Sequence, residues 1–253
     1  MEVKNIKFGY QNKPLINNLS ISFKKHKITS IIGPNGSGKS TLLMLLSRIY
    51  KASEGKIILD NKNIWDYRNK DFAKKVAMVH QKNNIQGDLD VKTIVGYGRL
   101  PYLNYHQSLS SDDYKIIEHA LEITKLKEYA HIPLINLSGG QQQRVWFAMA
   151  LAQKTPILLL DEPTTYLDVK YQIEILNLIK KINIDYQMTI IMVHHDINQA
   201  INYSDEIIAM KNGRMLFQGK PNEVITSKSL KQLYDYDFNI IEYQNNKIVL
   251  NYQ

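Results

Sequence analysis

The chain has 253 residues, an ordinary globular composition and a formal net charge of +8 at pH 7. Because it contains no cysteine, a disulfide framework and a thiolate metal site are excluded. The N-terminus lacks the apolar core of a secretory signal, and no apolar run approaches the length that spans a bilayer. We therefore expect a cytoplasmic protein with one large domain, or a domain with a subdomain.

The positive charge raises the question of nucleic acid or an anionic membrane as a partner. The lysines, such as Lys24, Lys74 and Lys180, are spread among turns and helix faces, with no interleaved aromatic stripe. This spread favours a solvated surface over a nucleic-acid site.

The N-terminal part of the chain is predicted to consist mainly of strands. Val3–Tyr10 and Leu19–Phe23 read as two strands, the second with clean alternation of apolar and polar residues. Another strand, Ile57–Leu59, follows a glycine-rich turn and a helix. The pattern predicts an antiparallel β layer beside an α/β core.

The central motif lies at Lys27–Leu46, where an apolar strand runs into a glycine-rich turn and then an aliphatic helix. The turn fits G-x-x-x-x-G-K-[ST] in the required strand–turn–helix context. Its glycines let backbone N–H groups approach phosphate oxygens, and the helix N-terminus adds its positive dipole end. Lys39 is expected to reach the β- and γ-phosphates, and the Ser40 hydroxyl to ligate magnesium. A merely structural turn would explain the glycines but not the Lys39–Ser40 pair.

A helical insertion is predicted after the next strand. Val76–Val79 is a short apolar strand that leads to Gln81, and the connection Asn83–Asp90 is polar. Further along, Leu137–Gln153 begins with a Ser-Gly-Gly turn and continues as a largely apolar helix. The change of character over this stretch indicates helices inserted into the α/β domain.

The longest predicted helix of the insertion is amphipathic and covers Ser111–Ala130. Ser110 with Asp113 matches a capping box at its start. The residues expected on its apolar side are Ile116, Ile117, Ala120, Leu121 and Ile123.

Two carboxylates follow a buried strand. The continuous aliphatic run Ile157–Leu160 is followed at once by Asp161 and Glu162. Such a run fits a parallel strand buried on both faces, and ligands of open α/β sheets bind at the carboxyl ends of these strands. We therefore expect both carboxylates where a phosphate chain would lie.

The last third of the chain repeats the α/β pattern. Val169–Ile182 is predicted to be a helix and Thr189–Val193 a buried strand that ends at two histidines. Ile207–Met210 and Met215–Phe217 flank an Asn-Gly turn typical of a hairpin. From Pro221 on, we expect helix and one or two short strands.

In order and rough spacing, these motifs resemble the nucleotide-binding subunits of ABC transporters over nearly the whole chain. The motifs are the phosphate loop, Gln81, the sequence LSGGQ at Leu137–Gln141, Asp161–Glu162, Asp168 and His195–Asp196. The resemblance implies an α/β P-loop NTPase of the ABC ATPase type. Its RecA-like α/β core would carry an antiparallel β layer, with a helical subdomain inserted between the Q-loop and the signature motif.

The resemblance also implies how the chain is divided. We expect a single ABC ATPase domain over 1–253. The core with its β layer would comprise 1–81 and about 153–237, the helical subdomain about 82–152, and a short C-terminal tail 238–253.

The resemblance implies ATP and Mg²⁺ as cofactors and assigns roles to matching positions. Tyr10 matches the aromatic residue that stacks on adenine. Glu162 matches the general base that polarises the attacking water, and His195 matches the histidine that contacts the γ-phosphate. His194 is given no role, because alternation along an extended segment points it the other way. Lys39 and Gln81 complete the catalytic set. Magnesium would be held by Ser40, Gln81 and Asp161. The phosphate-binding positions are Gly33, Pro34, Asn35, Gly36, Ser37, Gly38, Lys39, Ser40 and Thr41.

The resemblance further implies that each site is completed by a second chain. Ser138, Gly139, Gly140 and Gln141 resemble the signature that covers the γ-phosphate of an ATP held by the facing chain, and Asp168 matches a residue that couples the two sites. The simplest assembly is a two-fold homodimer with the nucleotide sandwiched at the interface. The other implied partners are integral membrane permease subunits and, indirectly, an extracytoplasmic siderophore-binding protein, which puts the chain at the cytoplasmic face of the membrane. No nucleic acid is expected.

The substrate is suggested by three stretches similar to the ferrichrome-type branch of this family. They are Val95–Leu103, Arg144–Trp146 and Thr164–Asp168. The similarity implies iron–siderophore import, with haem or cobalamin as alternatives, and Val95–Leu103 is expected to dock on the permease. A soluble ABC-type ATPase acting on nucleic acid or ribosomes is the alternative of another class, but its long coiled-coil insertion or second cassette is missing from this sequence.

Overall fold

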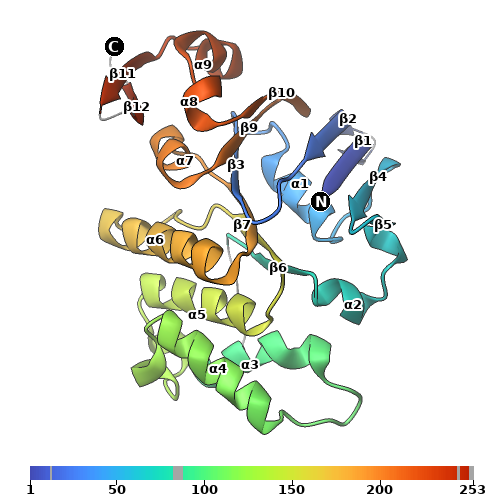
Figure 1. The fold of residues 1–253 in the computed structure, drawn as a ribbon, viewed down its shortest axis with the longest axis vertical. Coiled ribbons are helices and arrows are strands. Elements are labelled where there is room, and N and C mark those ends of the chain that lie inside the picture. The colour runs from blue at the N-terminus through green and yellow to red at the C-terminus, as the bar shows by residue number, and fades with distance from the viewer. Residues whose placement is uncertain (12, 82–87, 244–245, 251–253) are drawn as a thin grey trace.

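The structure is a computed structural model that describes residues 1–11, 13–81, 88–243 and 246–250. It places strands and helices in layers, with the N-terminal strands at one side, a helical group at one end and the C-terminal segment at the other (Figure 1). Of the polar connection predicted at Asn83–Asp90, residues 83–87 lie outside the described part.

The central sheet has six strands in the order β10-β9-β3-β8-β7-β6. Its neighbours run parallel, except that β10 is antiparallel to β9. Every residue of β3, β7 and β8 is buried, as expected for parallel strands covered on both faces. The strands are β3 (Ile28–Ile32), β6 (Val76–Val79), β7 (Ile157–Asp161), β8 (Thr189–Val193), β9 (Glu206–Lys211) and β10 (Arg214–Gly219).

A second, antiparallel sheet has the order β2-β1-β4-β5, which confirms the predicted β layer. The bounds predicted for its second strand are wrong, because β2 begins at Lys13 and ends before Phe23. Tyr10 of β1 pairs with Lys13, and the polar residues at the start of β2 conceal the strand from a search for apolar alternation. The strands are β1 (Glu2–Tyr10), β2 (Lys13–Ser22), β4 (Glu54–Leu59) and β5 (Lys62–Asn63).

The helices fall into two groups (Figure 1). Those between β6 and β7 form the helical group: α3 (Val91–Gly96), the 3₁₀ helix η2 (Tyr97–Tyr102), α4 (Ser111–Ile123), η3 (Lys127–Tyr129), η4 (Leu134–Asn136) and α5 (Gly139–Ala152). The others are α1 (Lys39–Leu46), η1 (Ile64–Asp66), α2 (Asn69–Ala73), α6 (Val169–Tyr186), α7 (Ile197–Tyr203), α8 (Pro221–Val224) and α9 (Ser227–Tyr234), followed by the hairpin β11 (Asn239–Tyr243) and β12 (Asn246–Leu250).

The amphipathic helix α4 starts as predicted and ends early. Ser110 and Asp113 form the capping box, with each side chain accepting from the other's backbone N–H. The predicted end at Ala130 is wrong, because the helix stops at Ile123. Thr124 donates its hydroxyl to the carbonyl of Ala120, and the next residue, Lys125, has the left-handed φ of 57° typical of a helix C-terminus.

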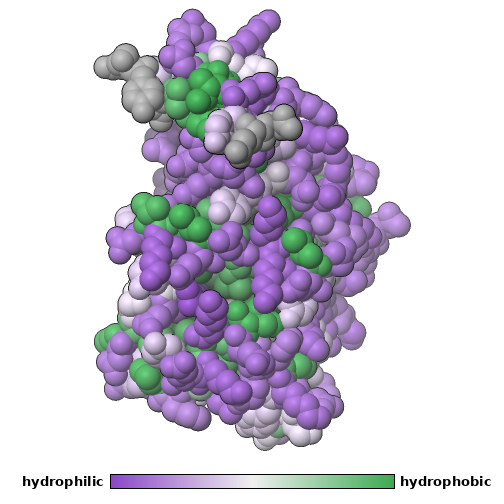
Figure 2. Space-filling model, turned by 60° about the vertical axis from the view of Figure 1, so that its left-hand side comes forward, coloured by the Kyte–Doolittle hydropathy of each residue, from purple (hydrophilic) through white to green (hydrophobic). Residues whose placement is uncertain are grey.

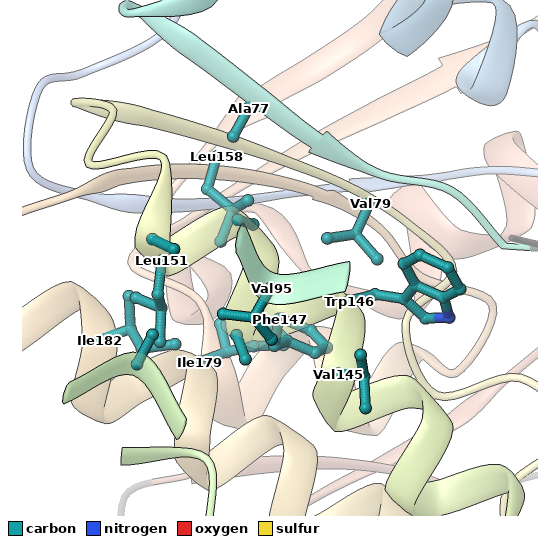
Figure 3. Packing of buried hydrophobic residues seen from close by; sticks show 14 of the residues in the cluster. Ala77, Val79, Val95, Val145, Trp146, Phe147, Leu151, Leu158, Ile179 and Ile182 are labelled. Carbon is teal, nitrogen blue, oxygen red and sulfur yellow. The ribbon is translucent and has the colours of Figure 1, made fainter. Parts of the chain in front are cut away.

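The helix α5 is packed into the largest hydrophobic cluster. Phe147 is fully buried and lies beside Val95 of α3 and Ile179 of α6 (Figure 3). Burying an apolar side chain of this size stabilises the fold by about 1.5–3 kcal/mol. The cluster therefore fixes α5 to both the helical group and the sheet.

The surface carries small, separate hydrophobic patches among hydrophilic residues on the face drawn in Figure 2. In the described part of the chain, no helix is both long and apolar enough to cross a membrane.

Candidate functional site

The phosphate loop joins β3 to α1 and has the backbone that its glycines permit. Gly33, Gly36 and Gly38 have φ values of 148°, 76° and 97°, which disfavour side chains. A Cβ on Gly33 would lie 2.0 Å from the carbonyl oxygen of Met210, so only glycine fits there. In the turn that follows β9, the N–H of Gly213 donates to the carbonyl of Ser37 across 3.1 Å. The loop is therefore buttressed by β9 and the hairpin turn that follows it.

Lys39 lies inside the loop that it follows. Its Nζ donates to the carbonyl oxygens of Gly33 and Pro34, at 2.8 and 3.0 Å. Burial lowers the pKa of Lys39, while the charges of Glu162 and Asp161 oppose that shift. A partly desolvated ammonium held by neutral carbonyls is a good partner for phosphate oxygens.

Ser40 and Asp161 lie together at the mouth of the loop. The Ser40 hydroxyl donates to Asp161 Oδ1 across 2.9 Å. Burial raises the pKa of Asp161, and the hydrogen bond from Ser40 opposes the rise. A bound divalent cation would compensate this buried carboxylate.

The donor set fits magnesium bound together with a nucleotide. Mg²⁺ is usually held by one or two carboxylates, substrate phosphates and water, rather than by an all-protein cage. Asp161 and Ser40 supply hard oxygen ligands of this kind, and no cluster of three or more His, Asp or Glu side chains suited to a metal occurs among the described residues. The buried Ser37 Oγ has no hydrogen-bond partner in that part of the chain, which suits a loop that binds an anion.

Glu162 lies at the centre of a polar network at the carboxyl edge of the sheet. Its Oε2 accepts from Gln81 Nε2 at 2.5 Å and from the Thr165 hydroxyl at 3.2 Å, and its Oε1 pairs with His195 Nε2. Gln81 follows β6, Glu162 follows β7 and His195 follows β8, so three adjacent parallel strands bring these groups together. His194 is buried, and its Nε2 has no hydrogen-bond partner among the described residues.

Tyr10, at the end of β1, lies over the start of α1. Its hydroxyl is 3.1 Å from the Thr41 hydroxyl, and the side chain is exposed. The rings of Tyr50 and Phe8 lie edge-on to it, with centroids 5.6 and 5.1 Å away. An exposed aromatic ring braced in this way presents a face on which a base could stack.

The LSGGQ motif forms the N-terminus of α5. Ser138 and Gln141 make a capping box, so the motif's hydroxyl and amide side chains also order the helix start. A Cβ on Gly139 would meet open space, whereas a Cβ on Gly140 would lie 2.8 Å from the Tyr171 ring of α6. Along the long axis of the molecule, α5 and α1 lie in different halves (Figure 1). The motif therefore does not cover the phosphate loop of its own chain.

A family model described as ABC transporter matches residues 16–165. The chain belongs to the ABC transporter family. It is 41% identical over 242 residues to the petrobactin import ATP-binding protein FpuC of Bacillus anthracis, covering 96% of this chain and 89% of that protein. It is 44% identical over 241 residues to the iron(3+)-hydroxamate import ATP-binding protein FhuC of Bacillus subtilis, covering 95% and 90%.

Solved structures agree with this family. A chain from an inward-facing structure of a metal-chelate type ABC transporter superposes with a TM-score of 0.85 at 28% identity, covering 98% of this chain and 95% of that one. A dimeric bacterial ABC transporter cassette superposes with a TM-score of 0.74 at 32% identity, covering 87% and 98%. The predicted ABC ATPase fold and the predicted ATPase activity are confirmed.

Asp168 of this ABC cassette is the N-cap of α6 and makes no side-chain capping hydrogen bond there. Around it, Tyr166, Val169 and Ile173 are 79%, 71% and 48% exposed. These apolar side chains lie next to a charged residue at the start of a helix, where a second protein surface could bury them.

Three residues of the candidate site were not predicted from the sequence. Tyr50 braces Tyr10, Thr165 donates a hydrogen bond to Glu162, and the Tyr171 ring lies 2.8 Å from where a Cβ at position 140 would be. Tyr50 could have been found from the sequence, because it is an aromatic residue shortly after the phosphate-loop helix. The other two contacts depend on tertiary packing and have no local signature.

Proposed function

We propose that this ABC ATPase powers the import of iron–siderophore complexes through a partner permease. The observation that carries the ATPase chemistry is Glu162, which is bonded to Gln81 and His195 beside the Ser40–Asp161 pair. The substrate class is supported by relatives named for importing petrobactin and iron(3+)-hydroxamate. The subunit would sit peripherally on the cytoplasmic face of the membrane.

ATP would be held by the phosphate loop, by Lys39 and by Tyr10. The loop N–H groups and Lys39 bind the β- and γ-phosphates, and Tyr10 stacks on adenine. Ser40 and Asp161, with Gln81, would hold Mg²⁺, which would neutralise charge on the phosphate oxygens.

Hydrolysis then needs a base and an oriented water. Glu162 accepts a proton from the water as it attacks the γ-phosphorus, and the bond to the β–γ bridging oxygen breaks to leave ADP and phosphate. His195 pairs with Glu162 Oε1. It would donate a hydrogen bond to the γ-phosphate when ATP is bound. This assignment makes Glu162 the general base.

Each site is completed by a second copy of the chain. Ser138 and Gly139 are exposed at the start of α5, remote from the phosphate loop of the same chain. In a two-fold dimer, this helix N-terminus would cover the γ-phosphate held by the partner. The exposed apolar residues around Asp168 would be buried in the same interface.

The helical subdomain, about residues 82–152, would meet the permease. Tyr97, Leu100 and Tyr105 are exposed on or next to η2, with 38%, 55% and 89% of their surface accessible. Large apolar side chains on a surface loop of this subdomain are suited to a protein partner. Through the permease, the subunit would serve an extracytoplasmic siderophore-binding protein.

The test of the site is Glu162→Gln, assayed for phosphate release with Mg²⁺ and ATP. Loss of a general base is expected to slow turnover by about 10²- to 10⁴-fold. Because the amide still fits the site, the variant should bind ATP and accumulate as a dimer in gel filtration. The exposed Glu242→Gln is the matched control. A Glu162→Gln variant that turns over at the parent rate refutes the assignment of the base.

The test of the substrate is uptake in a strain that lacks this chain. Restoring the chain should restore uptake of labelled ferric siderophore. If it instead restores only haem or cobalamin uptake, the substrate class is one of those. Salt-sensitive stimulation of ATP hydrolysis by nucleic acid, with no effect on uptake, would support a soluble ATPase instead.

A further inference from the structure

A buried ion pair joins the loop η2 to the helix α4. Arg99 Nε donates to Asp113 Oδ1 across 2.9 Å, with 6% and 11% of the two side chains exposed. Tyr102 stacks on this guanidinium at 3.9 Å. Because a buried charge is costly unless it is fully partnered, an arginine here requires a specific arrangement of its neighbours.

The second hydrogen bond of Arg99 reaches the C-terminal end of α5. Its Nη1 donates to the carbonyl of Ala152 across 2.6 Å, and the Tyr102 hydroxyl donates to the carbonyl of Gln153 at 2.9 Å. Carbonyls in the last turn of a helix lack intrahelical donors and carry the negative end of its dipole. A Cβ on Gly98 would lie only 2.3 Å from the carbonyl oxygen of Met149. The loop is therefore fitted directly onto the end of α5.

The other end of α5 is the LSGGQ motif. The helix runs from Gly139 to Ala152, so its ends are about 20 Å apart at a rise of 1.5 Å per residue. It is fixed in the hydrophobic cluster of Figure 3, and Arg144 pairs with Glu174 of α6. A helix packed in this way moves as one body.

The outer side of the same loop is exposed and apolar. Leu100 follows Arg99 directly. The Arg99 side chain is buried, whereas that of Leu100 is 55% exposed. The loop also reaches α2, where Lys70 Nζ donates to the carbonyl of Leu103 at 2.5 Å. The loop thus lies between a surface available to a partner and the end of the signature helix.

We propose that Arg99 is a positioning residue that fixes the loop Tyr97–Tyr102 to the C-terminal end of α5, so that displacement of the loop by a permease moves the signature at Ser138–Gly140. The proposal rests on the proposed function, because it assumes that this loop meets a permease. Arg99 takes no part in binding ATP. It transmits motion by holding two segments in one geometry.

A label experiment tests the geometry without the permease. The chain has no cysteine, so Leu100→Cys and Ile135→Cys, both at exposed positions, carry the only two spin labels. Double electron–electron resonance should give a narrow distance distribution, which broadens in Arg99→Lys because lysine cannot make the two directed bonds of the guanidinium. Arg68→Lys, which alters an exposed ion pair with Asp71, is the control. An unchanged distribution in Arg99→Lys overturns the proposal.

A second experiment tests the coupling itself in the strain used for uptake. With Arg99→Lys or Asp113→Asn, the purified subunit should keep its ATPase rate, whereas ferric siderophore uptake per membrane-bound subunit should fall by at least about fivefold. A merely structural role would lower melting temperature, ATPase rate and uptake together, which also overturns the proposal. Asp113→Asn keeps an acceptor for the capping box, so it remains informative if Arg99→Lys does not fold. If the parent chain itself fails to restore ferric siderophore uptake, the substrate assignment fails, whereas the spin-label result still tests whether Arg99 fixes the loop.

Discussion

His194 should make the protein sensitive to mild acid, and His194→Leu should remove that sensitivity. The side chain is 2% exposed at the end of β8, and its Nε2 has no hydrogen-bond partner among the described residues. Burial lowers the pKa of His194 to about 4 from its ordinary value of 6.5. Below pH 6.5, His194 therefore becomes protonated in the unfolded chain, whereas in the folded chain it stays neutral until about pH 4.

The stability contributed by the neutral imidazole is fully present above pH 6.5 and is lost as the pH falls toward 4. For these two pKa values, the loss at pH 5 relative to pH 7.5 is about 2 kcal/mol. In a chain of this size, 1 kcal/mol corresponds to roughly 2–4 °C in melting temperature, so the effect is about 4–8 °C. Leucine has a similar volume and no proton to bind, and it leaves no polar nitrogen unpaired.

The assay is a thermal melt followed by circular dichroism at pH 7.5 and pH 5, without nucleotide, for the parent and for His194→Leu. The parent should lose about 4–8 °C more than the variant between the two pH values. His131→Gln, at a histidine whose side chain is 81% exposed, is the control and should behave like the parent. Equal losses in the parent and in His194→Leu would refute the reasoning, because they would show that burial of this imidazole does not set the acid sensitivity.

Three further predictions concern the nucleotide site and the signature. Tyr50→Ala should weaken ATP binding, measured by titration calorimetry, by less than Tyr10→Ala does. Stacking on a base is worth about 1–3 kcal/mol, and Tyr50 acts only through Tyr10. Equal ATP affinities in Tyr50→Ala and the parent would contradict this prediction. Ser138→Arg should leave ATP binding by the isolated subunit largely intact yet eliminate hydrolysis, and normal turnover would show that the signature does not complete a partner's site. Gly140→Ala should lower the melting temperature, because the new Cβ meets the Tyr171 ring at 2.8 Å, whereas Gly139→Ala should not; equal melting temperatures would contradict the contact.

The sequence by itself determined the fold class and was enough to propose most of the candidate site. The phosphate loop, the LSGGQ motif and Asp161–Glu162 are short contiguous patterns, and each chemistry depends on residues close together in the chain. Continuous aliphatic runs marked β7 and β8, because strands covered on both faces have no polar side. Local patterns of this kind can be recognised without knowledge of the tertiary structure.

The tertiary structure decided what depends on residues far apart in the chain. The end of α4 and the start of β2 were missed because a left-handed Lys125 and a polar hairpin leave weak local signals. The network of Glu162 with Gln81 and His195 forms only because β6, β7 and β8 are neighbours in the sheet. Arg99 is the clearest case, since its sequence reads as a basic residue in a loop, and only packing brings Asp113 and the end of α5 around it. Burial turned that charge from a solvated group into one that holds two segments in a fixed geometry.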